Sequence, residues 1–269
     1  MNFYFASTGS RGSKTFNALF LAGSRHMLHS YANNDPVSFA AYCKSCCSAA
    51  PDFHLMVDSG AFPMWKSGKR VDLHKYADTV TYSMKLLSHY VKSGRLYFVS
   101  LDDIPDGVGR AECLESARKS YSNFEYLYKR VGRGIIPVFH RGESMSMLSD
   151  YCAACGYVGL GLGNTLSLPA RIQFVTECFD HVGSVKKFHL FGVYNLALFR
   201  ACPAYSADTA SANYSVPIIS RLHAKIMRGK KLQKFSTYSM RELRARSMLN
   251  NVAAITEYWK GKGVVFNDM

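Results

Sequence analysis

Residues 53–62 read Phe-His-Leu-Met-Val-Asp-Ser-Gly-Ala-Phe, and this stretch sets the pattern from which the fold is predicted. The apolar run Phe53–Val57 is followed at once by Asp58, Ser59 and Gly60, as a buried strand is followed by a turn. Further short apolar, aromatic or β-branched runs end in polar or glycine-containing sequence in the same way: Asn2–Ala6, Leu96–Leu101, Gly134–Phe139, Tyr157–Leu162, Lys187–Val193 and Ala204–Ala207. We therefore predict seven buried strands.

Stretches of helical composition separate most of these runs. They are Pro36–Ala49, Leu73–Lys92, Ala111–Val131, Ser144–Cys155 and Leu168–Val182. Strands that alternate with helices are typical of parallel βαβ units. No Gly-x-Gly-x-x-Gly motif opens the first helix, so we expect an α/β fold of the TIM-type (β/α)₈ barrel rather than an open dinucleotide-binding sheet. Val216–Ser220 and Gly263–Asn267 are the two candidates for the eighth strand.

Length and composition fit one domain. The chain has 269 residues, 48% of them hydrophobic, which is enough for a packed core. We expect a single barrel domain over residues 1–269, with a basic helical segment at about 212–250. No apolar stretch is long enough to span a membrane, and the first residues lack the basic start of a signal peptide. These features predict a cytoplasmic protein with no membrane partner.

The eight cysteines favour thiols over a metal centre. The pairs Cys43/Cys46 and Cys152/Cys155 have Cys-x-x-Cys spacing, but each lies in a predicted helix and more than a hundred residues separate the pairs. Without a secretion signal we expect reduced thiols. We predict neither a metal site nor a cofactor.

The charge of the chain indicates a polyanionic partner. Lys and Arg total 33 against 19 Asp and Glu, for a net charge of +14. The segment Arg221–Arg246 holds nine Lys or Arg and one acid, with Phe235 and Tyr238 among them. Such a segment suits a phosphate backbone, although a solvated helix face is the alternative. The residues predicted to bind nucleic acid are Arg221, Lys225, Arg228, Lys230, Lys231 and Lys234.

Carboxylates follow the predicted strands where the active sites of such barrels form. Asp58 and Asp208 lie 150 residues apart, yet both are expected at the barrel mouth. Two carboxylates that face one anomeric carbon can exchange a glycosidic bond in two steps, one as nucleophile and one as general acid and base. We assign Asp208 as nucleophile and Asp58 as acid/base. The acid/base partner needs a raised pKa, which burial or a neighbouring charge provides.

Other residues at the strand ends suit a planar base. Phe62 and Phe191 are placed to hold such a base between their rings. Asp102 and Asp103 offer acceptors for the N1–H and 2-amino group of guanine. The side chains of two adjacent residues after a strand point in different directions. We therefore expect one of Asp102 and Asp103 to bind the base, and the sequence leaves open which one.

At these positions the chain resembles the tRNA-guanine transglycosylase family, over about residues 2–211. Asp58–Phe62 is similar to that family's Asp-Ser-Gly-Gly-Phe motif, and His189–Val193 to its His-Tyr-Leu-Met-Gly-Val motif. His140 stands in place of the purine-binding Gln, and Asp208 takes the position of the nucleophile. The resemblance implies a pentosyltransferase whose substrate-binding residues are Ser59, Gly60, Phe62, Asp102, Asp103, His140, Gly159, Leu160, Gly161, Phe191 and Gly192.

The chain departs from the bacterial tRNA enzymes at one point. They bind a structural zinc with cysteines after the nucleophile, whereas no cysteine follows Cys202 here. A basic chain without that zinc element is more similar to the compact DNA-guanine transglycosylases of phage and bacteria (DpdA-type). That similarity implies DNA as partner and a free 7-deazaguanine base, such as preQ0, as second substrate. The alternatives are the same exchange on tRNA, a base-excising DNA glycosylase, a non-catalytic nucleic-acid-binding barrel and a metabolic barrel with an unrelated substrate.

Overall fold

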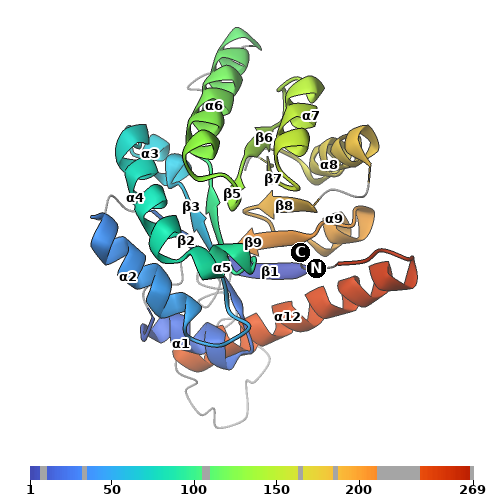
Figure 1. Ribbon diagram of the computed structural model, residues 1–269. Coiled ribbons are helices and arrows are strands. Elements are labelled where there is room, and N and C mark those ends of the chain that lie inside the picture. The colour runs from blue at the N-terminus through green and yellow to red at the C-terminus, as the bar shows by residue number, and fades with distance from the viewer. Residues whose placement is uncertain are drawn as a thin grey trace.

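The chain folds into an α/β barrel, as the sequence predicts. The computed structural model describes residues 1–6, 11–31, 35–104, 110–162, 166–183, 187–210 and 237–266. These residues form nine parallel strands in one sheet, which curves into a nearly closed barrel with the helices outside it (Figure 1). The order of the strands in the sheet is β5-β4-β3-β2-β1-β9-β8-β7-β6.

Strands and helices alternate along the chain. The strands are β1 (Asn2–Ala6), β2 (His26–Ser30), β3 (His54–Asp58), β4 (Leu96–Val99), β5 (Ile135–Ile136), β6 (Val138–His140), β7 (Tyr157–Gly161), β8 (Lys187–Phe191) and β9 (Ser206–Thr209). The helices are α1 (Lys14–Leu21), α2 (Pro36–Cys47), α3 (Ala61–Lys66), α4 (Leu73–Leu86), α5 (Ser88–Lys92), α6 (Arg110–Val131), α7 (Met145–Ala154), α8 (Leu168–Val182), α9 (Leu196–Ala201) and α12 (Thr237–Gly261).

The barrel closes at a strand that proline interrupts. The two edge strands, β5 and β6, are consecutive pieces of one segment separated only by Pro137. Because proline has no backbone N–H, it cannot donate to the ladder at that point. β5 pairs with β4, and β6 pairs with β7, so this segment joins the two edges. With β5 and β6 counted as one strand, the described residues make an eight-stranded barrel.

The strand that the sequence analysis misses is β2. Its sequence, His-Met-Leu-His-Ser, has no apolar run, because two histidines and a serine occupy it. His29 faces α2, where its ring lies 4.2 Å from that of Tyr42 between centroids. Burial lowers the pKa of His29 to about 4, so the ring is neutral near pH 7 and packs as an aromatic side chain.

Neither position proposed for the eighth strand is supported. Val216–Ser220 lies outside the described residues, and residues 263–266 form no strand. The last predicted run is also shifted, because β9 spans Ser206–Thr209 rather than Ala204–Ala207. Asp208 therefore lies inside the last strand instead of after it.

Helix α12 follows β9 and packs against α1 and α9 (Figure 1). Its buried residues recur at the spacing of a helical face: Ala245, Met248, Val252 and Ile255. The amino group of Met1 donates to Thr256 Oγ1 at 3.0 Å and ties this helix to the start of β1. Fully burying an aliphatic side chain contributes about 1.5–3 kcal/mol, so this stripe is enough to hold the helix in place.

Part of the predicted nucleic-acid-binding segment belongs to α12. Arg241 donates to Thr15 Oγ1 at 2.9 Å, and Arg246 donates to the Leu21 carbonyl at 3.3 Å. These two arginines therefore tie α12 to α1. The six residues predicted to grip phosphates, Arg221, Lys225, Arg228, Lys230, Lys231 and Lys234, lie outside the described residues.

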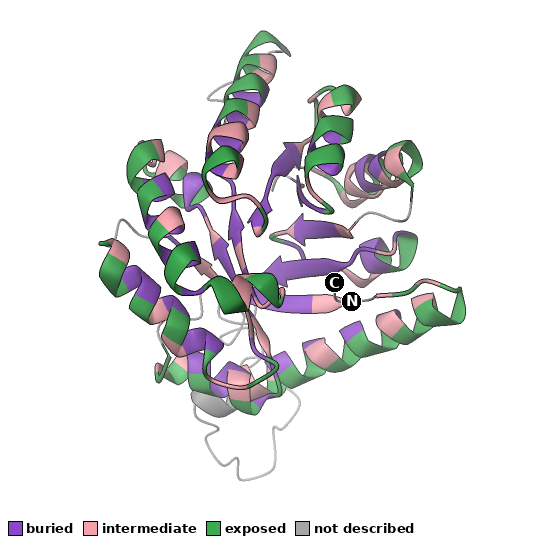
Figure 2. Ribbon diagram, in the orientation of Figure 1, coloured by how far each residue is buried: buried purple, intermediate pink, exposed green. Residues whose placement is uncertain are grey.

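The strands and the inward-facing sides of the helices are buried (Figure 2), and the buried apolar side chains form two layers. The larger lies between strands and helices and includes Phe39, Phe98 and Phe188. The smaller fills the barrel interior and consists of Tyr4, Ala6, Leu28, Met56, Val99, Ile136, Val138, Tyr157 and Tyr205. Successive residues of a strand point to opposite faces of the sheet, so a residue two positions after a member of this interior layer also points into the barrel. Such residues form the floor of the barrel mouth.

Candidate active site

The strand register gathers polar side chains at one end of the barrel. Ser30 lies opposite Asp58, while Gly161 lies opposite both His140 and Phe191. Ser30 and Asp58 follow Leu28 and Met56 by two residues and therefore face the same interior. This is the end of the sheet where parallel strands finish and where barrel enzymes carry their chemistry. The gathering of Asp58 and His140 at one mouth agrees with the sequence prediction.

Asp58 is a carboxylate with a raised pKa. Ser30 Oγ donates to its Oδ2 at 3.0 Å, and the Gly60 N–H donates to the same oxygen at 3.2 Å. Burial and then the charge of Asp102 raise the pKa of Asp58 to about 7, against these two donors and with a smaller contribution from Asp208. Among the described residues no donor reaches Oδ1. Asp58 can therefore give or take a proton near neutral pH.

The turn after Asp58 requires glycine. Gly60 has φ +78°, and a Cβ at that position would lie 2.6 Å from the Tyr31 carbonyl oxygen. The buried Ser59 hydroxyl accepts from the Ala61 N–H at 3.3 Å and donates to Asp102 Oδ1 at 3.4 Å. Ser59 and Gly60 thus hold the strand end in shape.

Asp102 faces the mouth and is paired with His140. His140 Nε2 lies 3.2 Å from Asp102 Oδ2, and its Nδ1 lies 3.1 Å from Glu143 Oε1. Burial opposes the charged imidazolium, but hydrogen bonds to Asp102 and Glu143 outweigh it and raise the pKa of His140 to about 10. The ring is therefore a cation at neutral pH between two carboxylates. Asp102 Oδ2 is the hydrogen-bond acceptor for this charged ring.

Asp103 points away from His140. Its Oδ2 accepts from Ser116 Oγ at 3.0 Å, and its Oδ1 lies 2.7 Å from Lys119 Nζ. The Asp103 N–H donates to Ser120 Oγ at 2.8 Å. Helix α6 therefore holds this carboxylate, which leaves Asp102 as the member of the pair beside His140 and Ser59.

Asp208 is anchored through one oxygen. Gly192 N–H donates to Oδ1 at 2.8 Å, and His189 Nε2 lies 3.2 Å from the same atom. His189 is fully buried, and its Nδ1 lies 2.7 Å from Ser206 Oγ, which in turn bonds the Tyr157 hydroxyl. Among the described residues no donor reaches Oδ2. These hydrogen bonds hold Oδ1 of Asp208 in place and leave Oδ2 to react with a substrate.

The glycines of β7 make room for two rings. A Cβ on Gly159 would lie 2.2 Å from the Phe191 ring, and one on Gly161 would lie 2.3 Å from the His140 ring. Both glycines are therefore needed where the rings cross the strand. The Leu160 side chain is buried in the core between strands and helices, and the resemblance implies a backbone contact with the base for this residue.

The two predicted stacking rings differ in their surroundings. Phe191 lies edge-on to His189, with centroids 4.4 Å apart. Phe62 is 46% exposed on α3, and its ring centroid lies 6.0 Å from that of Trp65. Among the described residues, the rings of Phe62 and Phe191 make no contact with each other.

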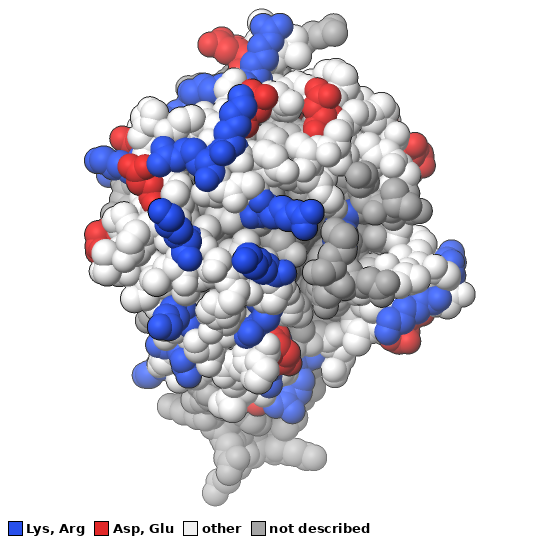
Figure 3. Space-filling model, viewed as in Figure 1, with Lys and Arg blue, Asp and Glu red and all other residues white. Residues whose placement is uncertain are grey.

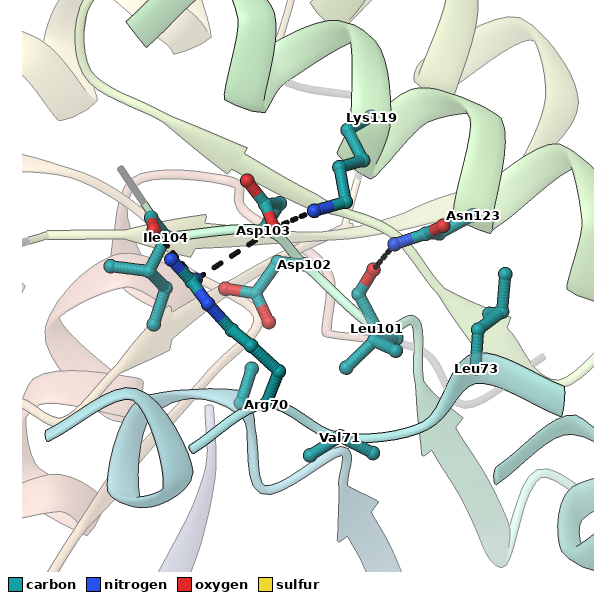
Figure 4. Close-up of a pocket in the computed structure, with 10 residues that line it drawn as sticks. Arg70, Val71, Leu73, Leu101, Asp102, Asp103, Ile104, Lys119 and Asn123 are labelled. Atoms are coloured by element: carbon teal, nitrogen blue, oxygen red, sulfur yellow. Dashed lines mark hydrogen bonds and ion pairs between the residues drawn. The ribbon is translucent and has the colours of Figure 1, made fainter. Parts of the chain in front are cut away.

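A cavity of about 180 Å³ opens beside Asp102 (Figure 4). Arg70 reaches into its wall from the connection between α3 and α4 and donates to the Ile104 carbonyl at 2.9 Å. The apolar part of the wall consists of Ala61, Val71, Leu73, Leu101 and Ile104. The rest of the lining is polar and consists of Arg70, Asp102, Asp103, Lys119 and Asn123. A recess with apolar walls and a few polar groups suits a planar heterocycle that carries N–H donors.

We predict that Gly161→Ala displaces His140. The added methyl group overlaps the ring, so the 3.2 Å contact of Nε2 with Asp102 must break. Overpacking of this kind costs about 1–3 kcal/mol. Denaturant unfolding measures the loss, and Gly261→Ala, where a Cβ meets nothing within 4 Å, is the control. Equal stability of both variants would contradict the role assigned to Gly161.

We predict that His140→Ala lowers the free energy of unfolding by about 3 kcal/mol, because two buried carboxylates lose their shared cation. The pKa of His140 rises from 6.5 in the unfolded chain to about 10 in the fold. Its contribution is therefore complete below pH 6.5 and is lost as the pH rises toward 10. Denaturant unfolding at several pH values tests this, with the exposed His89→Ala as control. A difference that stays constant with pH would refute the pairing.

The described basic surface is not confined to the mouth. Lys and Arg gather on the face that carries α5, with few acids among them (Figure 3). Because α5 leads into β4, this face lies at the other end of the barrel. Several helices carry basic residues in their last turn, where the helix dipole favours cations: Lys44, Lys85, Lys92, Lys129 and Lys260. Part of the net positive charge therefore stabilises the C-terminal ends of helices.

The cysteines lie away from the mouth chemistry. All eight are free thiols, and Cys43, Cys46 and Cys47 are buried together on α2. Within the described ranges no group of three His, Cys, Asp or Glu is arranged to hold a metal ion. Over the same ranges, the helices lack the length and apolarity needed to cross a membrane.

Sequence reasoning assigned no role to several residues of the site. Ser206 precedes Asp208 by two positions, and His189 precedes Phe191 by two, so strand alternation was the signal that would have found them. Ser30 lies on the strand that the analysis missed. Glu143 carries no such signal, because its contact depends on the turn after β6.

No protein-family model matches the sequence, and a search of curated proteins finds no match. The resemblance to the guanine transglycosylases therefore rests on the motifs and their order along the barrel.

Proposed function

We propose that the protein is a pentosyltransferase that exchanges guanine in DNA for a free 7-deazaguanine base of the preQ0 type. One observation carries the proposal. Asp58, whose pKa is raised to about 7 in part by the charge of Asp208, lies at the same barrel mouth as Asp208, and among the described residues donors reach one oxygen of Asp208. A group that gives and takes a proton and a carboxylate with a free oxygen are the two parts that such an exchange requires.

In the first step, Asp208 Oδ2 attacks C1′ of the target nucleotide. The C1′–N9 bond breaks, its electron pair goes to the departing guanine, and the Asp58 carboxyl supplies a proton to that base. The product is a covalent ester between Asp208 and the deoxyribose. His189 and Gly192 hold Oδ1, so the attacking oxygen is oriented without rearrangement.

In the second step, the Asp58 carboxylate takes a proton from the incoming 7-deazaguanine. The base nitrogen so freed attacks C1′, and Asp208 leaves as a carboxylate. Asp58 thereby returns to its protonated form. The reaction needs no net proton, oxidant or cofactor, which agrees with the expectation that the chain uses none.

The cavity beside Asp102 suits the base. Asp102, which pairs with His140, accepts from the N–H and amino donors on one edge of a guanine-like ring. A buried acceptor left without those donors is costly, so adenine-like bases are disfavoured. DNA is proposed as the polymer from the net charge of +14 and from the resemblance to the zinc-less branch.

Label transfer tests the proposal. The protein is incubated with radiolabelled guanine or preQ0 together with duplex DNA, single-stranded DNA or tRNA, and each polymer is counted. Label in DNA is the expected result. Label only in tRNA would reassign the polymer, and release of guanine without incorporation would identify a hydrolytic glycosylase. Absence of both label and released base from every polymer would refute catalysis and leave a binding barrel.

A further inference from the structure

Aromatic and basic residues lie together directly after Asp58. Helix α3 and the turn that ends it carry Phe62, Trp65, Lys66 and Lys69. The Phe62 and Trp65 rings lie 6.0 Å apart between centroids at an interplanar angle of 32°. Neither ring belongs to the buried core, and Phe62 is 46% exposed. Phe62 is exposed and Trp65 is half-buried, so both rings have surface that a ligand can reach.

The two lysines of this segment are exposed. Within the described ranges, no carboxylate or other side chain contacts their ammonium groups. Arg70 differs, because it lies 3.8 Å from Asp103 and bonds the Ile104 carbonyl. Lys66 and Lys69 thus offer charge that the fold does not use.

The position of α3 at the mouth is fixed by the backbone. Gly60 precedes the helix with φ +78°, and its Cα approaches the Tyr31 carbonyl so closely that a Cβ would lie at 2.6 Å. Only two residues separate Asp58 from the first residue of α3. A ligand on α3 is therefore next to the carboxylates.

Other exposed cations follow strands elsewhere around the barrel. Arg11 and Lys14 follow β1, and Arg141 follows β6. Of the exposed acids at this end, Asp35 and Asp72 cap helices, and each accepts from two backbone N–H groups, while Glu112 lies in the first turn of α6. Charge complementarity at the rim thus favours an anionic polymer.

We propose that α3 and its terminal turn bind a single-stranded polynucleotide segment adjacent to the nucleotide at the mouth. Trp65 stacks on a flanking base, Phe62 continues the stack toward the target base, and Lys66 and Lys69 bind phosphates. The inference rests on the proposed function for the class of polymer only. It concerns binding, so it is tested without any base exchange.

Tryptophan fluorescence provides the test. The chain has two tryptophans. The second, Trp259, lies on α12, away from the mouth, and donates to the Phe199 carbonyl of α9. A thymidine 12-mer is titrated into the full-length protein, and a labelled copy reports binding by anisotropy. Trp65 emission should fall as the oligonucleotide binds. In Trp65→Phe the quench should disappear, and in Trp65→Ala affinity should fall about 5- to 100-fold. Heparin, a polyanion without bases, should bind without quenching.

The lysines are tested through salt dependence. Lys66→Ser/Lys69→Ser should flatten the log–log salt slope by about 1.4, at roughly 0.7 for each single-strand phosphate contact. The control is Lys85→Ser/Lys92→Ser, which removes two exposed cations at the opposite end and should leave the slope unchanged.

The outcomes separate the two proposals. A quench that depends on Trp65 together with a slope that depends on Lys66 and Lys69 supports the inference, whether or not bases are exchanged. Binding without a quench, an unchanged slope in the Lys66/Lys69 variant, or no oligonucleotide binding at all overturns it. If base exchange is observed in any of these cases, the proposed function remains supported while the inference about α3 is overturned.

Discussion

Asp208→Asn should reduce base exchange by about 10⁴-fold or more, the loss typical of removing a catalytic nucleophile. The amide cannot form the ester with C1′, although it keeps the shape of the carboxylate and an oxygen for the Gly192 N–H. The measurement is the initial rate of label incorporation at saturating DNA and base. Circular dichroism and DNA affinity should stay close to those of the wild type.

The matched control for this variant is Asp150→Asn. That carboxylate is exposed on α7, and its loss changes the net charge by the same amount. The control should exchange bases at the wild-type rate. Substantial turnover by Asp208→Asn, with the control unchanged, would remove Asp208 from the role of nucleophile.

Asp58→Asn should slow both chemical steps, by about 10² to 10⁴-fold, because proton transfer to and from the base is lost. The same variant should be more stable than the wild type at high pH. The pKa of Asp58 is 3.8 unfolded and about 7 folded, so the folded chain binds the extra proton between these values. Wild-type stability therefore falls as the pH rises from about 4 to 7, and the amide avoids this loss.

Thermal unfolding at pH 5 and pH 8 measures the second effect. The melting temperature of Asp58→Asn relative to wild type should be higher at pH 8 than at pH 5. A difference that does not change with pH would show that the Asp58 carboxyl has an ordinary pKa in the fold. Exchange within a factor of two of wild type would separately exclude its role in proton transfer.

The sequence was sufficient for the barrel because helical stretches separate most of its apolar runs. It failed at β2, where His26, His29 and Ser30 remove the apolar pattern although Met27 and Leu28 are buried. It also placed the last strand two residues early. Ser206 and Asp208 read as a polar turn by composition, yet both are buried through contacts with His189.

The sequence identifies the carboxylates of the candidate site but not the side chains that contact them. Asp58 and Asp208 follow from their positions at the ends of the predicted strands, although the structure places Asp208 inside β9. The choice between Asp102 and Asp103 needed the tertiary placement of His140 and Lys119, which lie on opposite sides of the chain after β4. The pKa of Asp58 likewise depends on burial and on Asp102, 44 residues away in the sequence. Pair contacts of this range leave no local pattern.

The covalent intermediate is the most direct test of the central claim. The protein is incubated with DNA and no incoming base, quenched in acid, digested with nuclease and trypsin, and analysed by mass spectrometry. The tryptic peptide of residues 201–221 contains Asp208 as its single side-chain carboxylate. We expect a deoxyribosyl nucleotide on this peptide in the wild type and none in Asp208→Asn. Base exchange that proceeds with no adduct on this peptide, or with the adduct on another one, would contradict the proposed mechanism.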